Sequence, residues 1–104
     1  MAEKIWTDVI AADALEPQWV TRVQLGPRMI AVYDTPSGIY ASLALCNHGG
    51  ADLCDGFFDE HVIECPLHQG AFDVRDGRPV SAPAMRQMRV FETRVVDGMV
   101  QIKF

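Results

Sequence analysis

The chain has 104 residues, of which 49% are apolar and 22% charged, so it has the composition of a folded globular protein and not of a disordered one. This length predicts a single domain over residues 1–104 with a modest core. The first residues lack a basic stretch followed by an apolar run, and no eighteen consecutive residues are apolar. We therefore expect a cytoplasmic protein that does not associate with membranes.

The net charge of −5 is unevenly distributed along the chain. Residues 46–76 contain seven acidic residues and one basic residue, whereas the rest of the chain contains seven acidic and eight basic residues. An acidic segment disfavours nucleic acid as a partner and suits docking to a basic protein. A solvated acidic face that serves only solubility is the alternative.

Short apolar runs separated by turn signals dominate the chain in sequence order. They predict strands at residues 19–25, 29–34, 38–43, 62–65, 88–95 and 99–104. Asp97-Gly98 is the clearest hairpin signal, because both residues tolerate the positive φ angles of a tight turn. Only residues 11–15 have helical character, and they are too few for more than one turn. The pattern predicts an all-β sandwich or barrel.

The predicted core comes mainly from the central strands. In the last strand, Val100, Ile102 and Phe104 alternate with Gln101 and Lys103, which predicts one buried face. Trp6 and Trp19 are assigned to packing. The other predicted core residues are Met29, Ile30, Val32, Tyr33, Ile39, Tyr40, Leu43 and Leu45.

Residues 44–83 interrupt this pattern and contain paired cysteine and histidine residues. Three cysteines, an odd number, favour metal or redox chemistry over a disulfide scaffold. Cys46-x-His48 and Cys65-x-x-His68 are each followed closely by glycine, which permits a sharp turn and a close approach of the backbone. The similarity of the two loops predicts that both bind the same metal group, from opposite sides, within a small loop-rich lobe.

Three kinds of chemistry use cysteine with histidine. Zinc fingers usually pair cysteine with cysteine and histidine with histidine, the latter on a helix, whereas each loop here supplies one of each. A catalytic Cys/His dyad would leave the second pair unused. An iron–sulfur centre accounts for the pairing if Cys46 and Cys65 hold one iron and His48 and His68 hold the other. Thiolate and imidazole also suit such a cluster.

The pattern C-x-H-x₁₆-C-x-x-H, followed by QGAFD and later by Ser81-Ala82-Pro83, resembles the Rieske [2Fe–2S] family. The stretch ECPLHQGAFDVRDG, together with the chain length and the hairpin at Asp97-Gly98, resembles the small Rieske ferredoxins of bacterial aromatic-ring-hydroxylating dioxygenase systems, such as those for biphenyl and naphthalene. The resemblance implies an all-β Rieske fold, with an antiparallel β-sandwich base and a small loop-rich cluster-binding lobe. It also implies one [2Fe–2S] cluster held by Cys46, His48, Cys65 and His68.

Departures from the Rieske proteins of respiratory bc complexes are also informative. Those proteins carry a disulfide between the cluster loops, where this chain has Ala51 and Leu67. They also carry a serine and a tyrosine that donate hydrogen bonds to cluster sulfurs, where this chain has Gly70 and Phe72. Without these donors to the reduced cluster, we expect a midpoint near the low end of the Rieske range, about −150 mV. Cys54 matches no ligand position and is interpreted as a structural thiol.

The resemblance implies an electron carrier and not an enzyme. It would take one electron from an NADH-dependent flavoprotein reductase and pass it to the terminal Rieske oxygenase of an aromatic-ring dioxygenase, and we expect it to be a monomer. The chain lacks a dinucleotide-binding glycine motif and is too short for the oxygenase subunit. His61, outside the motif, is interpreted as a surface residue. A Rieske subunit of a nitrite reductase or of a multicomponent monooxygenase, and more remotely a structural zinc module, remain as alternatives.

Overall fold

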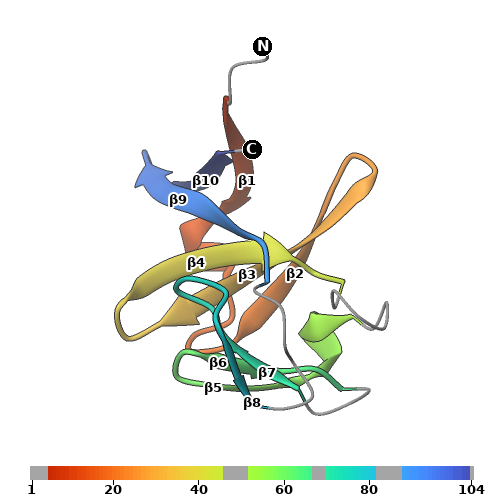
Figure 1. Cartoon of the computed structure of the whole chain (residues 1–104). Coiled ribbons are helices and arrows are strands. Elements are labelled where there is room, and N and C mark those ends of the chain that lie inside the picture. Colours follow the sequence, from red (N-terminus) through yellow and green to blue (C-terminus); the bar gives the residue numbers. More distant parts are fainter. Residues whose placement is uncertain (1–4, 46–51, 67–69, 82–87, 104) are drawn as a thin grey trace.

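The computed structural model describes residues 5–45, 52–66, 70–81 and 88–103, and all structural statements below concern these ranges. Within them the chain forms ten strands and two short 3₁₀ helices. The strands divide into a six-stranded and a four-stranded antiparallel sheet (Figure 1). No helix in the described ranges is long and apolar enough to cross a lipid bilayer.

The large sheet takes strands from both ends of the chain. Its order is β1 (Trp6–Ala11), β10 (Met99–Lys103), β9 (Val90–Val96), β4 (Gly38–Leu43), β3 (Arg28–Thr35) and β2 (Val20–Leu25). The sheet curls so that its edge strands β1 and β2 contact each other. The first 3₁₀ helix, η1 (Ala12–Ala14), lies between β1 and β2 in the sequence, where the only helical segment was predicted.

Tight turns determine the register of the hairpins in the large sheet. Asp97 and Gly98 both have positive φ angles, 50° and 78°, which confirms the predicted turn between β9 and β10. Gly26, at φ 61°, begins the turn between β2 and β3. Because side chains alternate along a strand, these registers decide which face of the sheet each residue occupies.

The small sheet contains only short strands. Its order is β5 (Phe57–Asp59), β6 (Val62–Glu64), β7 (Ala71–Asp73) and β8 (Pro79–Ser81), and the second 3₁₀ helix, η2 (Leu53–Asp55), precedes it. The predicted loop-rich lobe is therefore more regular than expected. Strands of three residues are too short to show a periodic pattern, which is why only the segment around β6 was predicted.

Strand β3 connects two hydrophobic cores. Ile30 and Val32 face the core inside the curled large sheet, where they join Val100 and Ile102. Ala31 and Tyr33, which alternate with them along the strand, face the core between the two sheets. Because both faces of β3 are covered, its residues from Ile30 to Tyr33 are fully buried.

The structure confirms most of the predicted core and strands and corrects some details. Ile30, Val32 and Tyr33 are fully buried, but Leu45 is 57% exposed because it lies beyond β4 at the base of a loop. Trp19 packs against two phenylalanine rings yet stays 40% exposed. Strand β1 was not predicted, because its sequence, WTDVIA, does not alternate strictly between polar and apolar residues.

Candidate metal centre

Of the four predicted cluster ligands, the structure describes Cys65. Cys46, His48 and His68 lie outside the described residues, and so do Ala51 and Leu67. Within the described ranges no three His, Cys, Asp or Glu side chains are grouped to hold a metal ion. The four-ligand set therefore stays a prediction, and the structure contributes the surroundings of Cys65 and the residues that flank the two ligand segments.

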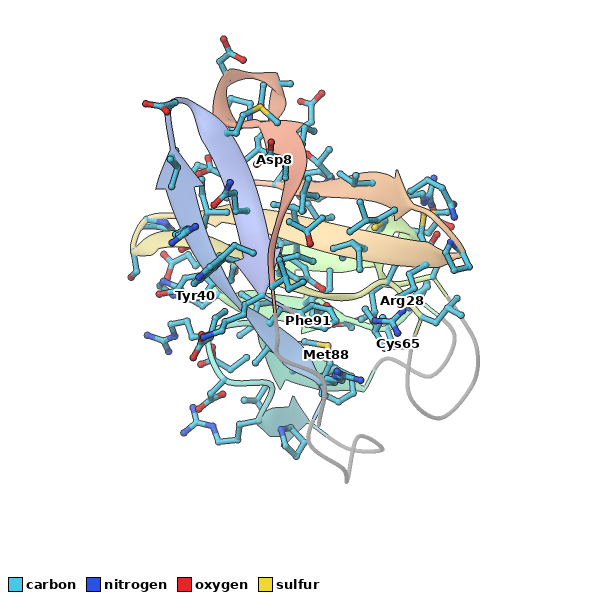
Figure 2. All side chains as sticks on the ribbon, turned by 90° about the horizontal axis from the view of Figure 1, so that it is seen from above. Asp8, Arg28, Tyr40, Cys65, Met88 and Phe91 are labelled. Carbon is cyan, nitrogen blue, oxygen red and sulfur yellow. The ribbon has the colours of Figure 1, made fainter. Side chains whose placement is uncertain are left out.

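Cys65 follows β6 directly and is fully buried with a free thiol. It belongs to the core between the two sheets, together with Phe72 and Met88, and Figure 2 shows Cys65 and Met88 on the same side of the molecule. The backbone N–H of Cys65 donates a hydrogen bond to the carbonyl of Gly70 at 2.7 Å. The segment that carries His68 thus starts and ends at two hydrogen-bonded residues.

The segment that carries Cys46 and His48 is closed in the same manner. The N–H of Leu53 donates to the carbonyl of Ala44 at 2.6 Å, and Leu45 pairs with Asp52 in an antiparallel bridge. We call these two pairs of flanking residues, Ala44 with Leu53 and Cys65 with Gly70, the loop bases; both are held by a backbone hydrogen bond.

Both loop bases also contact one hydrophobic core. Ala44 and Leu53 at the first base, and Cys65 and Phe72 beside the second, are members of the same cluster of buried residues. Apolar surroundings exclude water from the Cys65 thiol, and a buried thiolate in a dry site is the kind of ligand that iron–sulfur clusters use. Cys65 thus fits the role predicted for it.

An ion-pair network joins the first loop base to the large sheet. The Arg22 side chain on β2 donates from Nε to Asp52 at 2.7 Å and from Nη2 to Asp55 at 2.9 Å. Asp52 also accepts a hydrogen bond from the N–H of Cys54 at 2.8 Å, which begins η2. Sequence reasoning missed Arg22, because nothing local to β2 indicates a partner thirty residues away.

Cys54 differs from Cys65 in its chemistry. It is half-buried, and desolvation, reinforced by the negative charge of Asp52, raises the pKa of its thiol to about 12. The thiol of Cys54 is therefore protonated at neutral pH and is a weak nucleophile. This environment supports the interpretation of Cys54 as a structural thiol.

Two glycines let the backbone approach closely in the small lobe. A Cβ atom at Gly56 would collide with the carbonyl oxygen of Glu64, the residue before Cys65. A Cβ atom at Gly77, which has φ 82°, would collide with the carbonyl oxygen of Met88. Asp76-Gly77 is a turn signal in the sequence, but neither close contact could be predicted from it, because the contacts connect separate strands and loops.

The turn between β7 and β8 is built around a buried carboxylate. Asp73 is paired with Arg75, which donates from Nε at 3.0 Å and from Nη2 at 2.7 Å, and Arg78 approaches at 3.5 Å. Hydrogen bonds from Arg75 hold the pKa of Asp73 below its usual range. Asp73, in the QGAFD motif, therefore has a structural role in this turn.

The phenylalanine of the same motif forms part of the core. Phe72 is fully buried, and Gly70 beside it is buried as well. His61 is half-buried at the β5–β6 turn, and its Nε2 atom lies 2.9 Å from the hydroxyl of Ser37.

The family model for the Rieske [2Fe-2S] domain matches residues 5–92 of the chain. The chain therefore belongs to the Rieske family, and it carries a Rieske-type [2Fe–2S] cluster, as predicted. The zinc-module alternative is thereby set aside. The all-β Rieske fold is confirmed as well.

Relatives place the chain more closely among the ferredoxins. It is 41% identical to ferredoxin CarAc of Metapseudomonas resinovorans, over 95% of this chain and 94% of that protein. It is 37% identical to the ferredoxin component of the naphthalene 1,2-dioxygenase system of Pseudomonas aeruginosa, over 98% and 97%. The ferredoxin in a solved complex of reduced oxygenase and oxidized ferredoxin in carbazole 1,9a-dioxygenase is similar, with 41% identity, a TM-score of 0.86, and coverage of 95% and 93%. The chain is thus an electron-carrying ferredoxin and not a catalytic enzyme.

Proposed function

We propose that this ferredoxin takes one electron at a time from an NADH-dependent flavoprotein reductase and delivers it to the terminal oxygenase of an aromatic-ring dioxygenase system. The cluster would be held by Cys46 and Cys65 on one iron and by His48 and His68 on the other. The observation that carries the proposal is the buried Cys65 thiol, whose backbone N–H is hydrogen-bonded to Gly70, in a chain of the Rieske family.

The ligand set determines the charge that the cluster supplies when bound. Two ferric ions, two sulfides, two thiolates and two neutral imidazoles sum to zero, and the cluster becomes singly negative on reduction. An all-cysteine cluster is more negative in both states and so accepts an electron less readily. The mixed ligand set therefore places the midpoint above that of plant-type ferredoxins.

The described residues around Cys65 hold its backbone in place and keep water away from its thiol. The hydrogen bond from Cys65 N–H to Gly70 holds the backbone of the predicted ligand, while Phe72 and Leu53 in the shared core keep water from this side. Since Gly70 and Phe72 offer no hydroxyl donors, we propose a midpoint near the low end of the Rieske range, about −150 mV. This potential suits transfer from a reduced flavin to an oxygenase that activates O₂.

The names of the relatives support the proposed acceptor. The proteins at 41% and 37% identity are named as ferredoxins or ferredoxin components, one of a naphthalene dioxygenase system, and the solved complex pairs such a ferredoxin with its oxygenase. These names favour a dioxygenase over the nitrite reductase and monooxygenase alternatives. We further propose a monomeric cytoplasmic carrier with one domain over residues 1–104 and a cluster lobe over about 44–83, with no nucleic-acid partner.

The proposal is tested by spectroscopy followed by reconstitution. The purified protein should contain iron and inorganic sulfide, absorb visible light as a red-brown protein, and bleach on addition of dithionite. Reduced protein should then reoxidise when mixed with a terminal aromatic-ring oxygenase under anaerobic conditions, and a flavoprotein reductase with NADH should reduce it again. A colourless protein that binds zinc, or a cluster protein that transfers no electrons to such an oxygenase, would refute the proposal.

A further inference from the structure

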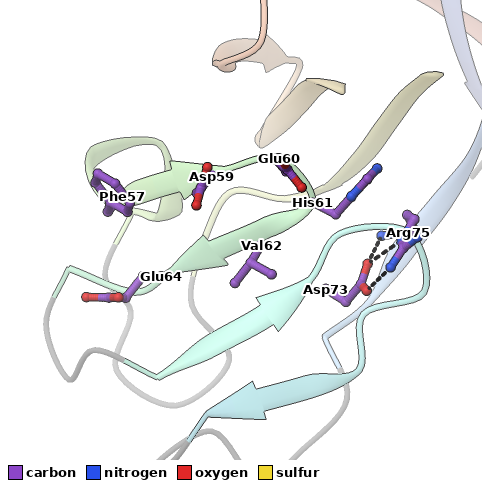
Figure 3. Close-up of a pocket in the computed structure, with 8 residues that line it drawn as sticks. All are labelled: Phe57, Asp59, Glu60, His61, Val62, Glu64, Asp73 and Arg75. Atoms are coloured by element: carbon purple, nitrogen blue, oxygen red, sulfur yellow. Dashed lines mark hydrogen bonds and ion pairs between the residues drawn. The ribbon is translucent and has the colours of Figure 1, made fainter. Parts of the chain in front are cut away.

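The outer face of the β5–β6 hairpin carries a hollow of about 430 Å³ that the cluster does not explain (Figure 3). Phe57 lies at one end of the hollow, and the ion pair of Asp73 with Arg75 lies at the other. Val62 lies between them. The hollow therefore opens on the side of the small sheet that faces away from the core.

The strand register places acidic and apolar side chains in alternation on this surface. Phe57 pairs with Glu64, and Asp59 pairs with Val62. Since directly opposed residues and residues two apart on one strand share a face, all four side chains lie on the outer face. We call these four residues the β5–β6 face. Its carboxylates, Asp59 and Glu64, occupy one diagonal, and its apolar side chains occupy the other.

The apolar part of the surface extends beyond the hairpin. Phe57 is 62% exposed, and its ring contacts that of Trp19 edge-on, with 6.5 Å between the ring centroids. Trp19 precedes β2 of the large sheet and is 40% exposed. Two exposed aromatic rings in contact, one from β5 and one from the residue before β2, form the kind of rigid apolar patch that anchors protein interfaces.

The carboxylates of this surface differ from the other acidic groups of the lobe. Asp52 and Asp55 are paired with Arg22, and Asp73 is paired with Arg75. For Asp59, Glu60 and Glu64, by contrast, the described part of the chain provides no ion-pair partner. Among the described residues, the acidic charge that has no ion-pair partner is thus concentrated next to Phe57 and Val62.

A lysine or arginine side chain of another protein matches this arrangement. Its aliphatic stem would pack on Val62 and Phe57, and its charged end would reach Asp59 or Glu64. An exposed Phe57 ring also attracts a cation over its face. Glu64 directly precedes Cys65, so a partner seated here would lie beside a predicted ligand of the cluster.

From these observations we infer that the β5–β6 face, with Trp19 at its edge, is a docking surface for a terminal oxygenase that presents a lysine or arginine beside apolar side chains. The inference rests on the proposed function, which supplies the acceptor. Opposite charges speed the encounter, and the aromatic pair holds the complex in one orientation. A small docking surface of four residues and Trp19 suits a redox partner that must bind and dissociate quickly.

The test measures anaerobic electron transfer from the dithionite-reduced protein, freed of excess dithionite, to the terminal oxygenase of carbazole 1,9a-dioxygenase by stopped-flow absorption. Asp59→Lys should slow the second-order rate about tenfold at low ionic strength, and the deficit should shrink as salt is added. Phe57→Ala should weaken binding about tenfold with less dependence on salt. Asp13→Lys, which makes the same charge change on η1, is the matched control and should leave the rate within about twofold.

The visible spectrum and midpoint of every variant must match the wild type, which shows that the cluster is intact. If the wild-type protein transfers electrons and Asp59→Lys and Phe57→Ala do so equally fast, the docking surface is refuted while the proposed function stands. If these variants instead slow only reduction by a flavoprotein reductase, the assignment to the oxygenase is overturned. If the wild-type protein itself fails to reduce the oxygenase, the proposed function fails and the docking inference fails with it.

Discussion

In the large sheet, β3 pairs with each of its neighbours over six residues, whereas every strand of the small sheet has three residues. The large sheet closes around its own apolar core, while the small sheet shares its core with one face of β3. Strands this short have little stability by themselves. The small lobe therefore depends on its anchors: the Arg22 and Asp73 ion pairs, the close backbone contact at Gly56 and, as proposed, the cluster itself.

The largest expected effect comes from removing the cluster ligand in the small lobe. Cys65→Ala should abolish the [2Fe–2S] cluster, because a Rieske iron cannot be held by the remaining thiolate alone. Since metal binding and folding are coupled, the small sheet should lose protection against amide hydrogen exchange while the large sheet keeps it. Iron content and hydrogen exchange measure the two effects.

Cys54→Ala is the matched control for this substitution. Cys54 matches no ligand position of the motif, so iron content should stay at the wild-type level. Full iron content in Cys65→Ala, or complete iron loss in Cys54→Ala, would contradict the assignment of ligands.

A smaller effect is expected at Gly56. Its φ of −84° suits any residue, so the cost of Gly56→Ala arises only from the collision of the new Cβ with the Glu64 carbonyl. Overpacking of this kind costs about 1 to 3 kcal/mol, and the displaced Glu64 should also move Cys65 and hasten iron release. Chemical unfolding and the rate of iron loss to a chelator measure both.

Gly26→Ala provides the control in the large sheet. A Cβ atom at Gly26 meets no atom, and only its positive φ of 61° makes the change unfavourable, by about 1 kcal/mol. Iron release should therefore stay at the wild-type rate. Equal acceleration of iron loss in both variants would show that Gly56 has no special link to the centre.

The next effect concerns pH. The pKa of Asp73 is lowered chiefly by its hydrogen bonds from Arg75, so this carboxylate stabilises the folded state above its unfolded pKa of about 3.9. That stability is lost as the pH falls through the lower folded pKa. Asp73→Asn should reduce the free energy of unfolding by about 1 kcal/mol at pH 7, a value that allows for the exposure of Arg75.

Urea unfolding followed by tryptophan fluorescence checks this behaviour. The difference between the wild type and Asp73→Asn should be constant from about pH 8 to pH 5 and should shrink below about pH 4. Asp59→Asn, which removes an exposed carboxylate with no ion-pair partner in the described ranges, should show no such trend. A constant difference down to acid pH would argue against the ion pair as the cause.

The smallest effect is expected for Arg22, whose side chain is 41% exposed. Arg22→Met should increase the rate of iron release by roughly twofold, because partly exposed ion pairs contribute little. Lys103→Met removes a 3.8 Å pair with Glu92 in the large sheet and should leave iron release unchanged. An equal increase in both variants would indicate that the Arg22 network does not support the loop base.

Prediction from the sequence succeeded where a pattern is long or chemically specific. Five strands of the large sheet are apolar runs of five to eight residues bounded by turn signals, and Asp97-Gly98 marks its hairpin, so these were found while β1 was not. The motif around Cys65 identified the family, because cysteine and histidine at such spacing serve few purposes. Strands β5, β7 and β8 were missed because three residues carry no period.

The acidic segment shows that a sequence does not reveal which charged side chains form ion pairs. Its composition predicted a charged surface, yet Asp52, Asp55 and Asp73 are neutralised by arginines. Only the pairing of β5 with β6 leaves the remaining charge beside Phe57 and Val62. Charge counts along a chain do not reveal which groups pair, because partners such as Arg22 and Asp52 are thirty residues apart.

The sequence by itself determined the chemistry of this protein: the all-β class, the mixed thiolate and imidazole motif, and the absence of hydroxyl donors at Gly70 and Phe72. These features are local, since they depend on residue type and short spacing. The tertiary structure alone decided which backbone groups close the ligand loops, which of two thiols lies fully buried, and where uncompensated charge remains. Each of these depends on contacts between distant segments, which form only when the two sheets pack together.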